Sequence, residues 1–271
     1  MPATFLGELL GTMILILLGD GVVAAVLLNK SKAQNAGWIV ITAGWAFAVM
    51  CGVFVASAFG AGGELNPAVT VANIIRGNDT IIQGFFNIVA QLIGAFIGAV
   101  LVWLMYLPHW EITQDQGAKL GIFSTGPAIR NVTGNLISEI IGTFVLVFVV
   151  YSFGPGGGQT PASNMGPFLV AALVWGIGLS LGGPTGYAIN PARDLGPRLA
   201  HFLLPVAGKG GSQWSYAWIP VLAPILGGFC GAAATDLRAE IIHTAAAVTE
   251  RTARITINIR VLIASYPPGR K

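Results

Sequence analysis

Charged side chains are scarce in this sequence. Only 9% of its 271 residues are Asp, Glu, Lys or Arg, whereas soluble domains carry roughly a quarter. Hydrophobic residues make up 54% of the chain, and its mean hydropathy is +0.74. These values exclude an ordinary water-soluble domain, and the lipid bilayer is the expected partner of most of the surface.

Cysteine and histidine are also sparse. Cys51 and Cys230 lie within apolar stretches, where small packing residues are expected, and they offer neither a disulfide framework nor metal-ligand spacing. The three histidines, His109, His201 and His243, fall outside the expected membrane spans, without a nucleophile and base at catalytic spacing. We therefore expect no metal, no cofactor and no enzymatic activity.

Basic residues gather toward the end of the chain. The stretch of about 236–271 holds six of the 14 Lys and Arg residues, without interleaved aromatics on a folded face, which argues against a nucleic-acid partner. Because basic residues are retained on the cytoplasmic side, this end should be cytoplasmic, and an even number of spans places the N-terminus there too. The location predicted is the cell membrane.

Apolar stretches long enough to cross a bilayer recur along the chain. Residues 1–28 lack the basic start and cleavage site of a signal peptide, so the first stretch should be retained. Two shorter apolar segments, about 66–76 and 190–200, are only half long enough to span. The predicted spans are about 4–28, 37–58, 83–106, 134–153, 166–183 and 214–235.

Each short segment begins with the triplet Asn-Pro-Ala. The copies are Asn66, Pro67 and Ala68 in the first half, and Asn190, Pro191 and Ala192 in the second. Asn caps helix starts and Pro is favoured at the first helical position, so each triplet predicts a helix that begins inside the membrane. Such a start presents unpaired amides and a positive dipole end. Two of them facing each other predict a polar constriction.

The two halves of the chain are repeats of one another. The segment Glu8-Leu-Leu-Gly-Thr is matched by Glu139-Ile-Ile-Gly-Thr, and the glycines of the third span, Gly94 and Gly98, by Gly227 and Gly231 in the sixth. Three spans per half is an odd number, so the second copy enters the bilayer from the opposite side. We expect one channel domain over 1–240, with inverted repeats of about 1–128 and 129–240, and a cytoplasmic tail over 241–271.

Two carboxylates fall inside predicted spans, at equivalent places in the repeats. Buried charges of this kind are costly in a bilayer and are candidates for a proton relay. Glu8 and Glu139, however, have no matching Lys, Arg or His in a neighbouring span. The favoured interpretation is structural: each carboxylate accepts hydrogen bonds from the irregular backbone before a half-helix.

These features resemble the aquaporin superfamily over about 3–235. The resemblance rests on the extended motifs Glu64-Leu-Asn-Pro-Ala-Val-Thr and Gly186-Tyr-Ala-Ile-Asn-Pro-Ala-Arg-Asp at inverted-repeat positions. It implies an all-α membrane protein with six transmembrane helices and two half-helices. It also implies a homotetramer with one pore per subunit, which passes small neutral solutes and excludes ions and protons.

Several residues resemble the glycerol-conducting branch of that superfamily. Asp194 follows Arg193 where water-specific members usually carry a small residue, and Arg198 and the pair Pro220-Val221 also match the branch. The resemblance implies glycerol and water as permeants, with urea as a further candidate. A predominantly water-selective channel is the alternative, and an ion- or proton-coupled transporter is a rival of another class.

By position, the resemblance implies a selectivity filter of Trp45, Gly178, Tyr187 and Arg193. Trp45 and Tyr187 would face the carbons of glycerol, while the planar guanidinium donates hydrogen bonds to its hydroxyls. Gly178 stands where water-specific filters carry His, which should widen the constriction. The other tryptophans lie at span ends and are expected in an interfacial belt: Trp38, Trp103, Trp110, Trp214 and Trp218.

Two departures from the family leave alternatives open. Tyr187 stands where the branch most often has Phe, so the balance of water against glycerol is not fixed by the sequence. Glu64 replaces a common His at the cytoplasmic mouth, where it would attract cations, respond to pH or simply be solvated. In the tail, the alternation over 254–260 is as compatible with a strand or a disordered extension as with a helix.

Overall fold

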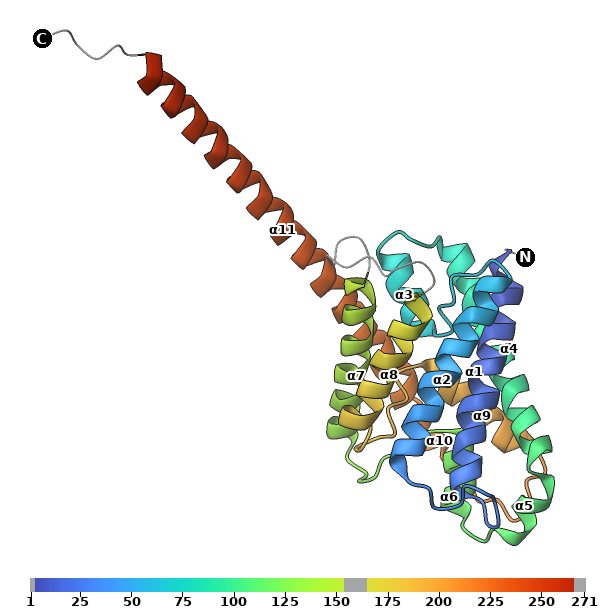
Figure 1. The fold of residues 1–271 in the computed structure, drawn as a ribbon. Coiled ribbons are helices and arrows are strands. Elements are labelled where there is room, and N and C mark those ends of the chain that lie inside the picture. Colours follow the sequence, from blue (N-terminus) through green and yellow to red (C-terminus); the bar gives the residue numbers. More distant parts are fainter. Residues whose placement is uncertain (1–2, 154–164, 266–271) are drawn as a thin grey trace, which may run out of the picture. The chain divides into compact units, whose positions relative to one another are not determined.

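The computed structural model describes residues 3–153 and 165–265, and within these ranges all regular structure is helical (Figure 1). Two compact units divide the chain, Met1–Ala232 and Ala233–Lys271, a boundary earlier than the position of about 240 expected from the sequence. The predicted all-α class is confirmed.

The helices are α1 Thr4–Leu27, α2 Trp38–Ala58, α3 Pro67–Ile75, α4 Ile81–Met105, α5 Leu107–Ile112, α6 Gln116–Phe123, α7 Val132–Ser152, α8 Gly166–Leu181, α9 Pro191–Leu203, α10 Trp214–Ala217 and α11 Ile219–Ser265.

The predicted spans correspond to α1, α2, α4, α7, α8 and the first part of α11, and the half-helices to α3 and α9. Among the described residues, five helical stretches are long and apolar enough to cross a membrane, and α8, with 16 residues, is a shorter apolar helix. Helix α11 continues to Ser265, so residues 254–260 are helical and form neither a strand nor an extended segment.

Polar caps fix where the long helices begin. The Thr80 hydroxyl accepts a hydrogen bond from the Gln83 amide at 3.1 Å at the start of α4. The Asn131 side chain accepts one from the Gly134 amide at 2.8 Å at the start of α7. Each cap satisfies an amide that has no partner within its own helix. The apolar stretches therefore become helices with defined ends.

Glycines allow the helices of each repeat to touch through their backbones. A Cβ at Gly94 of α4 would lie 2.2 Å from the carbonyl oxygen of Leu9 in α1. A Cβ at Gly227 of α11 would lie 2.4 Å from the carbonyl oxygen of Ile140 in α7. Both distances are too short for any side chain. The paired glycines of the sequence repeat thus mark equivalent close crossings, as expected where small residues drive packing in membranes.

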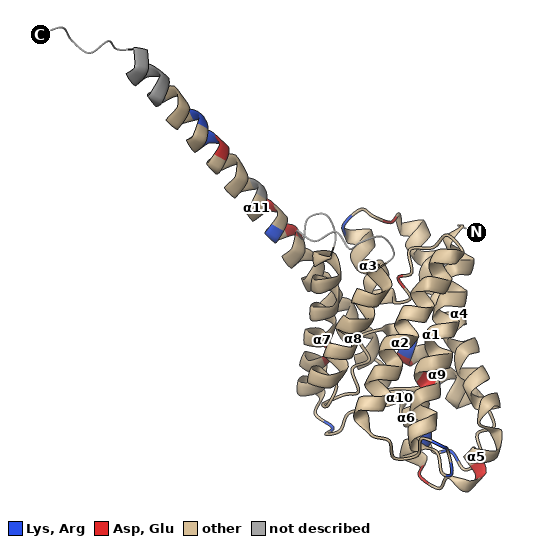
Figure 2. Cartoon of the chain, in the orientation of Figure 1, with Lys and Arg blue, Asp and Glu red and all other residues tan. Residues whose placement is uncertain are grey.

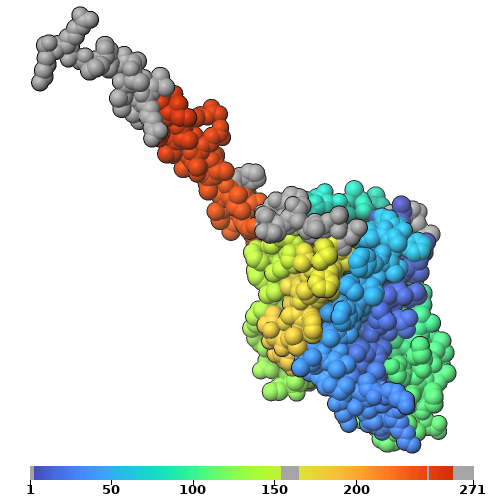
Figure 3. Space-filling model, in the orientation of Figure 1, coloured from blue at the N-terminus to red at the C-terminus, as the bar shows by residue number. Residues whose placement is uncertain are grey.

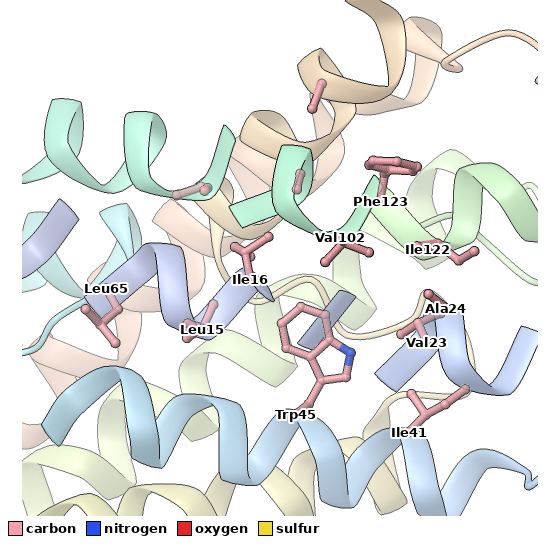
Figure 4. Close-up of a cluster of buried hydrophobic side chains, with 14 of the residues drawn as sticks. Leu15, Ile16, Val23, Ala24, Ile41, Trp45, Leu65, Val102, Ile122 and Phe123 are labelled. Carbon is pink, nitrogen blue, oxygen red and sulfur yellow. The ribbon is translucent and has the colours of Figure 1, made fainter. Parts of the chain in front are cut away.

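The interior of the first unit is apolar and continuous. Figure 4 shows Trp45 of α2 among aliphatic side chains of α1, with Val102, Ile122 and Phe123 beyond them. Helices α2 and α8, which are far apart in sequence, lie side by side on the face seen in Figure 3. Charged residues are few along these helices (Figure 2). This packing holds the two half-helices in place.

Two sequence-based placements are wrong. Trp110 is not part of an exposed belt, since it is 1% exposed, stacks on Phe123 and donates its indole N–H to the carbonyl of Trp103 at 2.9 Å. Cys230 is exposed on the surface of its helix, and is not a buried packing residue. Hydropathy located the helix of Cys230 but not which of its faces turns inward, and it did not predict the short helix α5, which carries Trp110.

Candidate functional site

The first triplet forms the start of α3. The Asn66 side-chain oxygen accepts a hydrogen bond from the amide of Ala68 at 2.9 Å, and Pro67 occupies the first helical position. Asn66 itself is extended, with φ −156° and ψ 114°. The local chemistry of Asn and Pro is therefore enough to begin a helix in the middle of the bundle.

The second triplet forms the start of α9 in the same way. The Asn190 side-chain oxygen accepts from the amides of Ala192 at 2.9 Å and Arg193 at 3.2 Å, with Pro191 at the first helical position. Its φ of −154° and ψ of 109° nearly repeat those of Asn66. The repeat seen in the sequence is thus a repeat of backbone geometry.

The two half-helices are joined across the repeats by reciprocal hydrogen bonds. The Asn66 amide group donates to the carbonyl of Ile189 at 2.8 Å, and the Asn190 amide group donates to the carbonyl of Leu65 at 2.7 Å. Leu65 and Ile189 both have positive φ, 54° and 43°, which is costly for such residues. Each Asn therefore uses one of its two side-chain N–H groups to bind the segment of the other repeat, and the second N–H remains available.

Glu8 is buried beneath the segment that leads into α3. One carboxylate oxygen accepts the Glu64 amide at 2.9 Å, and the other accepts the Leu65 amide at 2.8 Å and the Gln91 side-chain N–H at 2.8 Å. The residue is fully buried. Its hydrogen bonds hold the strained backbone at Leu65.

Glu139 lies beneath the segment that leads into α9. Its two carboxylate oxygens accept the amides of Ala188 at 2.9 Å and Ile189 at 2.8 Å. Its side chain is also buried. The amides of both lead-in segments therefore point into the protein, away from the space between the half-helices.

That space is a cavity of about 530 Å³ lined by both repeats. Its polar lining includes Asn66, Asn190, Arg193 and Glu64, and its apolar lining includes Val49 and other aliphatic side chains. The lead-in segments Gly62–Leu65 and Tyr187–Ile189 also contribute to it. A lining that contains both apolar and polar residues suits a solute that has both kinds of surface.

Three of the four predicted filter residues meet at this cavity. The Arg193 guanidinium lies over the Trp45 ring, 4.0 Å from its centroid, and Tyr187 lines the same space. Gly178 stands behind Tyr187, because a Cβ at this position would lie 2.9 Å from Cζ of the phenol ring. The room left by Gly178 is therefore filled by Tyr187.

Asp194 stands at the centre of a buried polar network behind the filter. It forms a two-point ion pair with Arg198, with N–O distances of 2.7 and 2.9 Å, and accepts the Thr125 amide and hydroxyl at 2.8 and 2.7 Å. Arg198 also donates to the carbonyls of Thr125 and Ser212, each at 2.8 Å. This network ties the start of α9 to the loop before α7.

Glu64 is held by hydrogen bonds, so it is not a freely solvated charge. Its carboxylate accepts from the Thr70 hydroxyl at 2.6 Å, from the Asn73 side chain and from the Asn87 side chain at 3.4 Å. Tyr151 donates its hydroxyl to Asn73 at 2.7 Å. The residue is thus built into a polar cluster at one end of the cavity.

Sequence reasoning missed two residues near the filter. Asp20 is fully buried in α1 with one carboxylate oxygen 3.5 Å from Arg193 Nη1, so Glu8 and Glu139 are not the only carboxylates inside the spans. Trp38 backs the filter, since its indole N–H donates to the Gly178 carbonyl at 3.0 Å. The scarcity of charge in apolar spans was the available signal for Asp20.

His201 falls outside the six predicted spans, as expected from the sequence. It lies within α9 and is fully buried, where its Nδ1 is 2.8 Å from the Ser212 hydroxyl and its ring packs edge-on against Phe123. In the part of the chain that the structure describes, no group of three His, Cys, Asp or Glu residues could hold a metal ion.

Comparison with known proteins gives a consistent result. The profile described as "Major intrinsic protein" matches residues 2–234. A protein named "Glycerol uptake facilitator protein 3" from Lactiplantibacillus plantarum is 57% identical over 227 residues, which cover 84% of this chain and 93% of that protein. A "Probable glycerol uptake facilitator protein" from Thermotoga maritima is 54% identical over 230 residues, 85% of this chain and 97% of that one.

A solved structure shares the fold as well. The X-ray structure of the aquaglyceroporin from Plasmodium falciparum matches with a TM-score of 0.74 and 27% identity, covering 85% of this chain and 93% of the other. The resemblance to the aquaporin superfamily inferred from the two Asn-Pro-Ala motifs is confirmed. The chain belongs to the major intrinsic protein family.

Proposed function

We propose that the protein is a passive membrane channel for glycerol and related small neutral solutes, which also passes water and excludes ions and protons. One observation carries this proposal: a single cavity is lined by both Asn-Pro-Ala asparagines and by Trp45, Tyr187 and Arg193. The names of the relatives, glycerol uptake facilitators, and of the structural neighbour, an aquaglyceroporin, support it.

The lining of the cavity suits a polyol. Glycerol presents carbon on one side and hydroxyls on the other, and Trp45 and Val49 offer an apolar surface for the carbons. The Arg193 guanidinium lies over the Trp45 ring, and because the guanidinium is planar its N–H groups lie in one plane for successive hydroxyls. The carbonyls of the lead-in segments are further acceptors, because their amides are bound by Glu8 and Glu139.

Three positively charged or positively polarised groups at the cavity exclude ions in this proposal. Arg193 carries a fixed charge at the filter, and the starts of α3 and α9 add the positive ends of two helix dipoles. Asn66 and Asn190 each retain one amide proton for a passing water, whose oxygen must then face both. Such an orientation interrupts the hydrogen-bonded chain that proton hopping requires.

The buried acids serve the framework in this proposal. Glu8 and Glu139 hold the lead-in segments, and Asp194 holds Arg198 and the loop at Thr125. None of these three needs to change protonation during transport. Transport is then downhill diffusion through a fixed pore, with no rocking movement between states.

Assembly and location follow from the family. The proposed unit is a homotetramer in the cell membrane, with one pore in each subunit over residues 1–240 and with both termini in the cytoplasm. The segment 241–271 is then a cytoplasmic tail. Urea is a further candidate permeant, since it is small, neutral and planar.

Stopped-flow light scattering on proteoliposomes tests the proposal. Water permeability is measured in an impermeant sorbitol gradient, and solute permeability in gradients of glycerol, urea and longer polyols. We expect glycerol to enter far faster than in protein-free vesicles, and longer polyols to enter more slowly than glycerol. Fast water flow with glycerol entry at the protein-free rate would show a water-selective channel instead.

A further inference from the structure

Asp20 is the one charged residue of α1 in the second half of that helix, and its side chain is fully buried. One carboxylate oxygen lies 3.5 Å from Nη1 of Arg193. Within the described ranges, this is the one hydrogen bond made by the Arg193 side chain. A carboxylate inside an apolar span is costly, so it is expected to have a functional or structural role.

The packing around Asp20 explains how it reaches Arg193. The preceding residue is Gly19, where a Cβ would lie 2.2 Å from Cζ3 of Trp45. The missing side chain lets the indole of Trp45 lie directly on α1. Arg193 then stacks on the same indole, 4.0 Å from the ring centroid, with its tip at Asp20. The guanidinium is therefore fixed by a ring on its face and a carboxylate at its end.

The two arginines of α9 differ in how they are held. Arg198 is bound at two points by Asp194 on its own helix and by the carbonyls of Thr125 and Ser212. That network contains no contact to Arg193. Arg193 depends instead on Asp20, which comes from the other repeat and is 173 residues away in sequence. Loss of this contact would leave Arg193 with Trp45 alone.

We propose that Asp20 is a positioning residue of the selectivity filter, which pins the Arg193 guanidinium against Trp45 and so sets discrimination between glycerol and water. The proposal rests on the proposed function for its transport readout. With Asp20 in place, the donors of Arg193 keep one orientation, and the lumen keeps the width that glycerol needs. Without it, the long side chain swings into the lumen and obstructs glycerol more than water.

A double-mutant cycle tests this, with the parent, Asp20→Asn, Arg193→Val and the double variant in proteoliposomes. Asp20→Asn should lower the ratio of glycerol to water permeability by about threefold or more, within the coupling range of residues in contact. In the Arg193→Val background the same change should leave the ratio unaltered. A control is Thr12→Val, which removes a buried hydroxyl group from α1 and should change neither permeability.

Unfolding of the four purified proteins in detergent gives a second readout that does not depend on transport. Arg193→Val leaves the buried Asp20 carboxylate without its cationic partner. The double variant should therefore have a higher midpoint of thermal unfolding than Arg193→Val alone. Equal effects of Asp20→Asn in both backgrounds, on the ratio or on the midpoint, would overturn the proposal. So would a failure of Asp20→Asn to assemble in both backgrounds, since its role would then be independent of Arg193. If the parent protein carried no glycerol, the proposed function would be overturned. The unfolding midpoints of the four proteins would still test the contact between Asp20 and Arg193.

Discussion

The phenol ring of Tyr187 occupies the space that a side chain at Gly178 would need. A Cβ at Gly178 would lie 2.9 Å from Cζ of Tyr187 and 2.9 Å from Cγ2 of Thr42. Trp38 supports this arrangement, since its ring meets Tyr187 edge-on at 5.8 Å and its N–H binds the Gly178 carbonyl. The width of the filter at this point is thus set by Gly178 and Tyr187 together. A side chain at position 178 has no room unless Tyr187 is also replaced.

The first prediction follows from this pairing. Gly178→His alone should assemble poorly, because the imidazole has no room beside Tyr187. Gly178→His combined with Tyr187→Thr removes the obstructing ring and places a polar group at the filter. We expect the double variant to assemble and its glycerol permeability to fall much more than its water permeability, measured by stopped-flow light scattering. Equal loss of both permeabilities would place the filter elsewhere.

The second prediction concerns Arg193→Val. The variant loses the fixed charge at the filter, where screening is weak and a cation is repelled strongly. We expect proton and Na⁺ entry into proteoliposomes to rise above that of the parent, measured with an internal pH dye and a Na⁺ indicator. Arg130→Val is the control, since Arg130 is an exposed arginine that donates to Ser215 far from the cavity lining. Unchanged ion leakage with unchanged solute selectivity would refute the filter assignment.

The third prediction concerns the two buried acids. Glu8→Gln and Glu139→Gln each replace an acceptor oxygen by an amide N–H that would face a backbone amide. A buried donor left without a partner costs about 1–3 kcal/mol, so both variants should unfold at lower temperature than the parent. Differential scanning fluorimetry of the purified proteins measures the change. Glu111→Gln, at an exposed position on α5, should unfold like the parent.

The same experiment separates a framework role from a proton relay. A relay residue would carry pH-dependent transport, and its replacement would abolish the pH dependence without lowering stability. If Glu8→Gln and Glu139→Gln were as stable as the parent, the hydrogen bonds seen in the structure would not be the reason for these carboxylates.

The fold could be predicted from this sequence because its signals are local. Apolar length predicts the spans, and Asn followed by Pro predicts the starts of α3 and α9. The repeat predicts the inverted pairing of the two half-helices, and the structure adds that Asn66 donates to Ile189 and Asn190 to Leu65. Each of these signals depends on neighbours in sequence or on equivalent positions, so no side-chain packing had to be known.

Contacts between distant side chains could not be predicted in this way. Asp20 meets Arg193 across 173 positions, and Trp38 meets the Gly178 carbonyl across 140. Both depend on which face of a span turns inward, and uniformly apolar helices give little indication of that face. The same reason explains the misplaced Cys230, whose helix was located correctly, whereas Trp110 lies in the short helix α5, which the sequence did not predict.

The last prediction concerns the reciprocal contacts at the centre of the cavity. Asn66→Asp and Asn190→Asp keep the acceptor that caps each half-helix, but lose the donors that bind the carbonyls of Ile189 and Leu65. Each also places a negative charge at a helix start, which offsets the positive dipole end.

We expect both variants to conduct glycerol and to admit protons and Na⁺ above the parent level, measured in proteoliposomes after oligomer size has been checked by chromatography. The matched control is Asn78→Asp, at an exposed position just beyond the other end of α3, where an added charge should not affect ion entry. Assembled Asn66→Asp and Asn190→Asp proteins that conduct glycerol and remain as ion-tight as Asn78→Asp would show that the triplets serve folding alone. The barrier to ions would then have to lie at Arg193, because it is the remaining fixed positive charge on the cavity wall among the described lining residues.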